Sequence, residues 1–252
     1  MNMKHFLLAW VASAWMLAAP AMAGNPSGAP EDWPDPMVDA SSATYVYGQF
    51  DRLEAGFSDN KDTNVVDAQA WIGGDYNKAW FKVEGEGLQG EPLEELEFQA
   101  LFSRLVSPFW DLQLGIRKDA RPREPGNYHA VIGFQGLAPQ WFEVDAAAFI
   151  SDDGDTTFRA EFEYEWMLTQ RLVLQPRLEI NAAAVDIPER GLDAGFNSSE
   201  AGLRLQYQVI REFSPYIGIS HSRKYGALAD AARIAGEPEH DTFWVVGVRM
   251  WY

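Results

Sequence analysis

Between residues 94 and 119 the sequence alternates between apolar and polar side chains, and this pattern constrains the fold more than any other feature. Phe98 and Phe102 fall on one parity, whereas Glu97 and Gln99 fall on the other. The alternation is interrupted once, at a Ser-Pro pair, and then resumes. A period of two is typical of β-strands whose two faces meet different environments. The stretch therefore predicts a hairpin rather than a helix.

The length and polarity of this hairpin indicate a membrane environment. Each half runs for about ten residues or more, longer than the usual strand of ~5–6 residues. One face is apolar and the other carries charge, which suits a strand with lipid outside and a polar lumen inside. A soluble β-sandwich or lipocalin-like barrel is the alternative, but its outer face would be interrupted more often by polar residues. We therefore predict an all-β, transmembrane, antiparallel β-barrel of the outer membrane.

The N-terminus has the features of an export signal. Lys4 precedes an apolar run over residues 6–19, and Ala21 and Ala23 are the small residues that a signal peptidase requires. We predict a signal peptide over residues 1–23, cleaved after Ala23, and therefore export to the Gram-negative outer membrane. Residues 24–43 are rich in Pro, Gly, Ser and Asp and predict a flexible periplasmic arm. The barrel is expected over residues 44–252.

The alternation continues along the rest of the chain in segments separated by turn-forming residues. Short connections alternate with longer ones, as in outer-membrane barrels. An even strand count places both termini on the short-turn side, which is periplasmic in such barrels. We predict about twelve strands, over 44–57, 65–76, 78–87, 94–105, 108–119, 128–137, 140–151, 156–168, 171–184, 198–211, 214–225 and 241–252.

Composition excludes several classes of function. Asp and Glu number 37 against 20 Lys and Arg, and the formal net charge is −17. Such an acidic chain is a poor ligand for nucleic acid, whose phosphates require basic residues. The absence of cysteine excludes disulfides and thiolate metal sites. No phosphate-binding loop, dinucleotide fingerprint or zinc motif is present.

Several longer strings together resemble a known family. They include WIGGDYNK at 71–78, SPFWD at 107–111, GLAP at 136–139, LTQRL at 168–172 and REFSPY at 211–216. This order of motifs resembles the copper resistance protein B family of Gram-negative outer membranes. The resemblance implies an outer-membrane barrel that binds copper and contributes to copper resistance and homeostasis. It also implies a periplasmic multicopper oxidase of the same resistance system as a partner, in addition to outer-membrane lipid and lipopolysaccharide.

The sequence departs from that family in its N-terminal segment. Family members often carry a His- and Met-rich segment, whose ligands suit copper. Here residues 24–43 contain Met37 and no histidine. The resemblance therefore does not extend to copper storage by this arm.

The inward parity of the predicted strands carries the candidate metal site. Acidic residues outnumber basic ones at these positions, so ion pairing cannot neutralise all of them. The excess is solvated, protonated or bound to cations. The alternative to a metal site is a charge-paired network with only a structural role, which fills a narrow barrel. We expect copper ions as the bound species, with carboxylate ligands helped by two histidines. The candidate ligands are His129, His240, Glu84, Glu86, Glu95, Glu97, Asp111, Glu143, Asp145, Glu161 and Glu163.

Two alternative functions remain open at this stage. One is a general channel for small solutes or cations without copper specificity. The other is a lipid-modifying hydrolase of the outer membrane, for which His221 lies between Ser220 and Ser222. Adjacent strand residues point to opposite faces and cannot form the hydrogen bond that such catalysis requires. We therefore expect no enzymatic activity and predict no catalytic residue.

Overall fold

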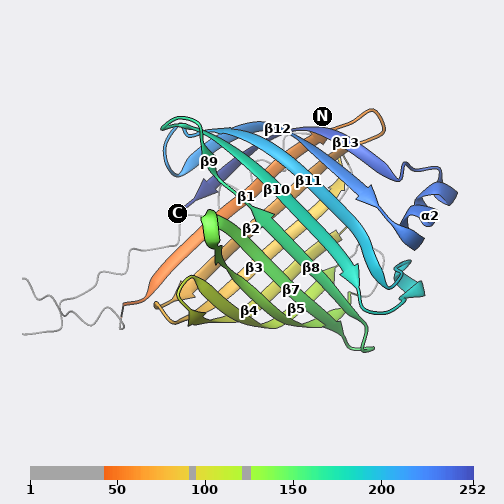
Figure 1. Ribbon diagram of the computed structural model, residues 1–252, viewed down its shortest axis with the longest axis horizontal. Helices are drawn as coiled ribbons and strands as arrows, with labels where there is room; N and C mark the ends of the chain where they lie inside the picture. Colours follow the sequence, from red (N-terminus) through yellow and green to blue (C-terminus); the bar gives the residue numbers. More distant parts are fainter. Residues whose placement is uncertain (1–42, 91–94, 121–125) are drawn as a thin grey trace, which may run out of the picture. The chain divides into compact units, whose positions relative to one another are not determined.

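The computed structural model of the chain describes residues 43–90, 95–120 and 126–252 (Figure 1). The predicted signal peptide at 1–23 and all of the arm at 24–43 except Ala43 lie outside the described residues. Described helices are few and short, and none of them is long and apolar enough to cross a membrane.

Thirteen β-segments, two short 3₁₀ helices and one α-helix make up the described elements. The strands are β1 (Tyr45–Phe57), β2 (Asp62–Gly73), β3 (Asn77–Leu88), β4 (Glu95–Ser107), β5 (Trp110–Ala120), β6 (Tyr128–Ala138), β7 (Phe142–Ser151), β8 (Thr156–Glu163), β9 (Trp166–Met167), β10 (Leu172–Ala183), β11 (Gly195–Tyr207), β12 (Phe213–Lys224) and β13 (His240–Trp251). The helices are η3 (Pro139–Trp141), η4 (Pro188–Arg190) and α2 (Gly226–Ala235).

The sheet is antiparallel and closes on itself between its first and last strands. Each strand pairs with the next along the chain, and β1 pairs with both β2 and β13. Because β8 and β9 both pair with β10, they are two parts of one strand, and the barrel has twelve strands as predicted. A closed sheet leaves no unpaired edge within the bilayer, which is the condition for a membrane-spanning barrel.

The interruption between β8 and β9 has a local cause in the neighbouring strand. The predicted strand at 156–168 breaks at residues 164–165, opposite Pro176 of β10. The amide of Tyr164 donates to the carbonyl of Pro176 over 3.2 Å. Proline has no amide hydrogen, so Pro176 cannot donate the second hydrogen bond that would complete this residue pair.

Burial in the barrel is the reverse of that in a soluble protein. In β4 the polar Gln99 and Ser103 are buried, whereas Phe98 and Phe102 on the opposite face are 44% and 52% exposed. The apolar rows predicted for residues 94–119 therefore form the outer surface. A continuous apolar exterior over a closed barrel is the arrangement that lipid requires.

A β-bulge in β1 explains why the parity of the first strand cannot be read from its sequence. The register of β1 shifts between Phe50 and Arg52 against β2, and between Phe50 and Leu53 against β13. A bulge adds one residue to one strand, and the inward parity changes at that point. Gln49 and Asp51 face the lumen before the bulge, and Arg52 and Glu54 face it afterwards.

The connections divide into two sets at opposite ends of the barrel (Figure 1). The short-turn end has the connections 74–76, 108–109, 139–141, 168–171 and 208–212. The start of β1 and the end of β13 lie at the same end. The long-loop end has the connections 58–61, 89–94, 121–127, 152–155, 184–194 and 225–239. The predicted turn at residue 107 lies at 108–109, where Phe109 adopts a positive φ of 73°.

Helix α2 was not predicted, since residues 226–240 were expected to form a loop. Asp193 accepts a hydrogen bond from the amide of Ala227 over 2.7 Å, which satisfies a free donor in the first turn of the helix. Gly236 ends the helix in the left-handed conformation, with φ of 77°. The helix thus depends on a cap from another loop, which short-range sequence pattern does not reveal.

Candidate functional site

The described residues of the barrel line at least two cavities in the lumen. The short-turn cavity has a volume of about 370 Å³ and includes Glu143 and Arg249 in its lining. The long-loop cavity has a volume of about 500 Å³ and includes Glu86 and Lys61. Three residues line both cavities and form the wall between them: Glu84, Phe149 and Arg159.

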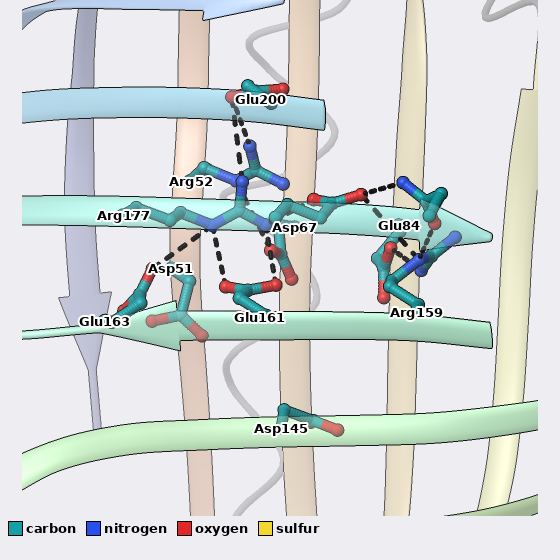
Figure 2. A network of polar contacts seen from close by, with 12 residues as sticks. Asp51, Arg52, Asp67, Glu84, Asp145, Arg159, Glu161, Glu163, Arg177 and Glu200 are labelled. Carbon is teal, nitrogen blue, oxygen red and sulfur yellow. Dashed lines mark hydrogen bonds and ion pairs between the residues drawn. The ribbon is translucent and has the colours of Figure 1, made fainter. Parts of the chain in front are cut away.

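Arg159 holds this wall together through ion pairs that cross the barrel. From β8 its guanidinium reaches Glu84 of β3 at 2.5 Å (Figure 2). It also reaches Glu97 of β4 at 3.0 Å. It also lies over the ring of Phe149, 5.6 Å from the centroid. Charge-assisted hydrogen bonds of this kind are the strong ones in proteins. These contacts therefore stabilise the wall.

Arg177 is a second centre of the network, and it binds four carboxylates. It contacts Glu161 at 2.6 Å and Glu179 at 2.8 Å, and it lies 3.3 Å from Glu163 and 3.6 Å from Glu200. Figure 2 shows its guanidinium between Glu161 and Glu163 on one side and Glu200 on the other. Two of these carboxylates have further basic neighbours: Glu179 lies 3.8 Å from Arg159, and Glu200 lies 3.6 Å from Arg52 and 3.7 Å from Arg204.

Other ion pairs join strands that are distant in sequence. Arg204 of β11 forms a two-pronged pair with Glu54 of β1, at 2.7 and 3.1 Å, and both side chains are buried. The remaining lumenal pairs include Lys82–Asp145, Arg52–Asp67, Arg249–Asp51 and Arg249–Glu165. Together these pairs fill the middle of the barrel.

One wall of the lumen is apolar. Trp80, Leu101, Val131 and Phe149 form a buried cluster whose side chains face inward from β3, β4, β6 and β7. Arg117 lies over the ring of Phe149, with the guanidinium carbon 4.6 Å from the centroid. Side chains packed in this way exclude water, so the cluster narrows the lumen beside the wall.

The two cavities differ in charge. The described lining of the short-turn cavity has seven carboxylates and three basic side chains. The described lining of the long-loop cavity has six carboxylates and seven basic side chains. The acidic excess predicted for the lumen is therefore concentrated at the short-turn end. The seven carboxylates there are Asp51, Asp67, Glu84, Glu143, Asp145, Glu161 and Glu163.

Most predicted carboxylate ligands lie in these cavities but are engaged with basic or amide groups. In the short-turn cavity the side chain of Glu143 has no ion pair or hydrogen bond with any described residue, whereas that of Glu163 also accepts from Gln175 at 2.8 Å. In the long-loop cavity Glu86 is likewise unpaired among the described residues. Asp111 lies outside both linings and pairs with Lys78 at 2.8 Å. The side chain of Glu95 lies outside the described part of the structure.

His129 faces the lumen as predicted, but an ion-pair network encloses it. Its Nε2 lies 3.2 Å from Asp119, and its side chain is 2% exposed. Asp119 also pairs with Arg117 at 2.6 Å and lies 3.5 Å from Arg190. An aspartate that binds two arginines and a histidine has a structural role, and it leaves His129 little freedom to approach an ion in the cavities.

His240 lies on the outside of the barrel, apart from the lumenal candidates. It begins β13, is exposed, and lies near His221 of β12. Among residues 43–90, 95–120 and 126–252, no group of three or more His, Cys, Asp or Glu side chains is arranged to hold a metal ion. The candidate ligands are thus divided between two cavities and the outer surface.

Sequence reasoning missed several lumenal residues, among them Asp51 and Arg52, which both face inward because of the bulge in β1. Each is an important member of the network, since Asp51 pairs with Arg249 at 3.3 Å and Arg52 with Asp67 at 3.4 Å. The two polar residues next to each other, within an otherwise alternating strand, were the available signal.

Among the described residues, the hydrogen-bond partner of the histidine considered for hydrolysis is a threonine and not a serine. His221 Nδ1 lies 2.9 Å from the hydroxyl of Thr242. Ser220 faces the lumen, where it donates to Glu200 over 2.9 Å. The predicted separation of His221 from its neighbouring serine is thus present in the structure.

Comparison with known proteins identifies the family. The family model described as Copper resistance protein B precursor (CopB) matches residues 44–252. The chain belongs to this family. It is 42% identical over 202 residues to Copper resistance protein B of Escherichia coli, covering 80% of this chain and 68% of that protein. It is 39% identical over 211 residues to a Copper resistance protein B homolog of Pseudomonas syringae pv. tomato, covering 84% and 71%.

A solved structure supports the fold. The NanC porin superposes with a TM-score of 0.52 at 10% sequence identity, covering 82% of this chain and 99% of the porin. This likeness concerns the barrel architecture alone, and it agrees with the predicted fold class.

Proposed function

We propose that this protein is an outer-membrane barrel that contributes to copper resistance by binding copper ions, or passing them, in its carboxylate-rich lumen. Membership of the copper resistance protein B family supports the role. The observation that carries the proposal is the charge of the short-turn cavity, where seven carboxylates face three basic side chains. Such an excess attracts cations and raises their local concentration.

The proposed ligands are the carboxylates of that cavity. Glu143 is the first, because it is unpaired among the described residues, and Asp145, Glu161, Glu163 and Glu84 surround the same space. Copper(II) accepts oxygen and nitrogen ligands in a tetragonal arrangement, which carboxylates and water can supply. Glu86 and Glu97 of the long-loop cavity, with Asp111 and Glu95, are secondary candidates.

Binding would proceed by exchange of ion pairs. Apart from Glu143, the proposed ligands are held by Arg159, Arg177 and Lys82, so an entering cation must replace a basic partner at one or more of them. The lysine of the Lys82–Asp145 pair is the easiest to displace, because a lysine binds as a point charge rather than through a planar fork. No covalent chemistry is involved.

The proposed partners are outer-membrane lipid and lipopolysaccharide, copper ions and a periplasmic oxidase. The apolar exterior would contact outer-membrane lipid and lipopolysaccharide. Copper ions would enter the lumen, and a periplasmic multicopper oxidase is proposed as the partner in the same resistance system. We propose that the short-turn end, with both ends of the described chain, faces the periplasm, as it does in barrels of this type.

A general cation or solute channel is the second candidate. The porin-like barrel fold favours the channel. The two lumenal cavities would form one path through the barrel if the wall between them opened. A channel of this kind would conduct common ions equally well with and without copper. The copper-binding proposal instead predicts a stoichiometric complex.

The deciding experiment is a copper(II) titration of folded, detergent-purified barrel followed by electron paramagnetic resonance. We expect an oxygen-ligated signal at stoichiometric metal that weakens in Glu143→Gln and Glu163→Gln. The control is Asp153→Asn, an exposed carboxylate in the connection 152–155, which should leave the lumenal signal unchanged. Absence of any oxygen-ligated signal in the unmodified protein would exclude lumenal copper binding, and ion conductance without it would favour the channel.

A further inference from the structure

Two histidines lie side by side on the outer face of the barrel, at its long-loop end. In the pairing of β12 with β13, His221 is opposite Thr242 and His240 is opposite Arg223. The histidines are therefore diagonal neighbours on one face of the sheet, within reach of each other. Their ring centroids are 6.0 Å apart, and both side chains are exposed. They are distant in sequence, so spacing along the chain does not reveal the pair.

The pair lies at the border of the apolar surface. The next outward residues toward the middle of the barrel are Ile219 of β12 and Trp244 of β13, and Trp244 is 69% exposed. Tryptophan is common at the level where lipid meets water. On the other side of the histidines the strands end and the connection 225–239 begins. An ion in the external water can therefore reach both rings without entering lipid.

The ring spacing fits a shared metal ion. A nitrogen–metal bond of about 2.0–2.1 Å places the ion roughly 3.2 Å from each ring centroid, so shared rings have centroids at most about 6.4 Å apart. The observed 6.0 Å is within this limit. Thr242 contacts His221 at Nδ1, at 2.9 Å, which leaves Nε2 for the ion. Neither ring nitrogen of His240 has a hydrogen-bond partner among the described residues.

The charges around the pair define its chemistry. The positive charge of Arg223 repels a cation at this site, because Arg223 is paired with His240 across the two strands. Glu239 attracts one, and the guanidinium of Arg233, at 2.6 Å, holds the pKa of Glu239 below its usual value. Asp241 faces inward, where it accepts from Ser58 over 3.1 Å, so it is not a ligand. Two imidazoles and water form the ligand set.

We propose that His221 and His240 together bind a divalent transition-metal ion at the outer surface, with copper(II) preferred. Imidazole suits copper, zinc and nickel, and copper(II) binds most tightly among the divalent ions of this series. The site is separate from the lumen, so it stands whether or not the lumenal carboxylates bind copper. It would act as an external point of capture or sensing for the metal.

The test uses copper(II) and folded, detergent-purified barrel. We expect the unmodified protein to show a copper(II) signal with two nitrogen ligands in electron paramagnetic resonance. His221→Asn and His240→Asn should each weaken copper(II) affinity by at least about tenfold and leave one nitrogen. The double variant should bind little more weakly than either single one, because one imidazole alone is a poor site. Arg223→Gln should strengthen binding, since it removes the opposing charge.

The outcomes separate this proposal from the lumenal one. Glu143→Gln and Glu163→Gln should leave the two-nitrogen signal intact while the oxygen-ligated signal weakens. Retention of the two-nitrogen signal in the double histidine variant, or its absence from the unmodified protein, overturns the proposal. Heat-dependent gel mobility would establish that each variant is a folded barrel.

Discussion

Replacing Arg204 with methionine tests whether the centre of the lumen is closed and dry. Arg204 and Glu54 have side-chain exposures of 2% and 4%, and their two-pronged pair joins β11 to β1. The change leaves the carboxylate of Glu54 buried without its arginine. Breaking a buried ion pair in this way costs about 3–5 kcal/mol. Methionine keeps most of the volume, so packing contributes little to the loss.

The double variant supplies the matched control for this measurement. Arg204→Met combined with Glu54→Leu removes both charges, and such replacements are often neutral or stabilising. We therefore expect the second change to recover most of the lost stability. The exposed pair Lys224–Glu237, with side-chain exposures of 38% and 58%, provides the surface reference. Lys224→Met should cost at most about 1 kcal/mol.

The assay is equilibrium unfolding of the barrel in lipid vesicles by guanidinium chloride, followed by tryptophan fluorescence. A cost for Arg204→Met no larger than that for Lys224→Met would refute the closed lumen, because it would mean that water screens the Arg204–Glu54 pair. The same result would favour the open channel over a barrel filled by ion pairs.

Three further predictions concern the wall, the sheet and the orientation. Arg159→Ala should join the two cavities and increase single-channel conductance in planar bilayers, whereas Arg159→Lys should change the conductance less. Equal conductance of the two variants would contradict the assigned wall. Gly115→Ala should cost about 1–3 kcal/mol of unfolding free energy, because its methyl group would lie 2.1 Å from the carbonyl oxygen of Ala100. Gly133→Ala, whose methyl group would lie 3.3 Å from its nearest neighbour, should cost less in the same measurement. Because the chain has no cysteine, Asp153→Cys in a long loop should react with an impermeant maleimide on whole cells, whereas Gln170→Cys in a short turn should not; the reverse labelling would contradict the proposed orientation.

The fold was predictable because the alternation of apolar and polar residues in each strand indicates the environment of its two faces. The alternation of Phe98 and Phe102 with Glu97 and Gln99 requires no knowledge of other strands, and twelve such segments define the barrel. The exceptions depend on pairing. The bulge at Asp51 is visible only as two register shifts, and helix α2 relies on Asp193 from another loop. Local pattern carries no information about either contact.

The candidate site was less predictable, because parity places a residue inside the barrel but does not give its partner. The sequence predicted a surplus of acids in the lumen but not its concentration at one end. His129 was correctly expected to face inward, yet Asp119, Arg117 and Arg190 enclose it. The closeness of His221 and His240 depends on the register of β12 with β13, which a fifteen-residue connection at 225–239 conceals.

The division of charge along the barrel favours binding over free passage. A cation in the long-loop cavity would meet Arg117 and Arg190 in addition to Arg159 of the wall. A cation in the short-turn cavity would meet Glu143 and its carboxylate neighbours, with fewer basic side chains among them. Coulomb repulsion is stronger where the effective dielectric constant is low. The arginines therefore oppose the entry of a cation more strongly inside the barrel than on an open surface. This division of charge supports the proposal that the short-turn cavity retains copper ions supplied from its own side rather than conducting them through the barrel.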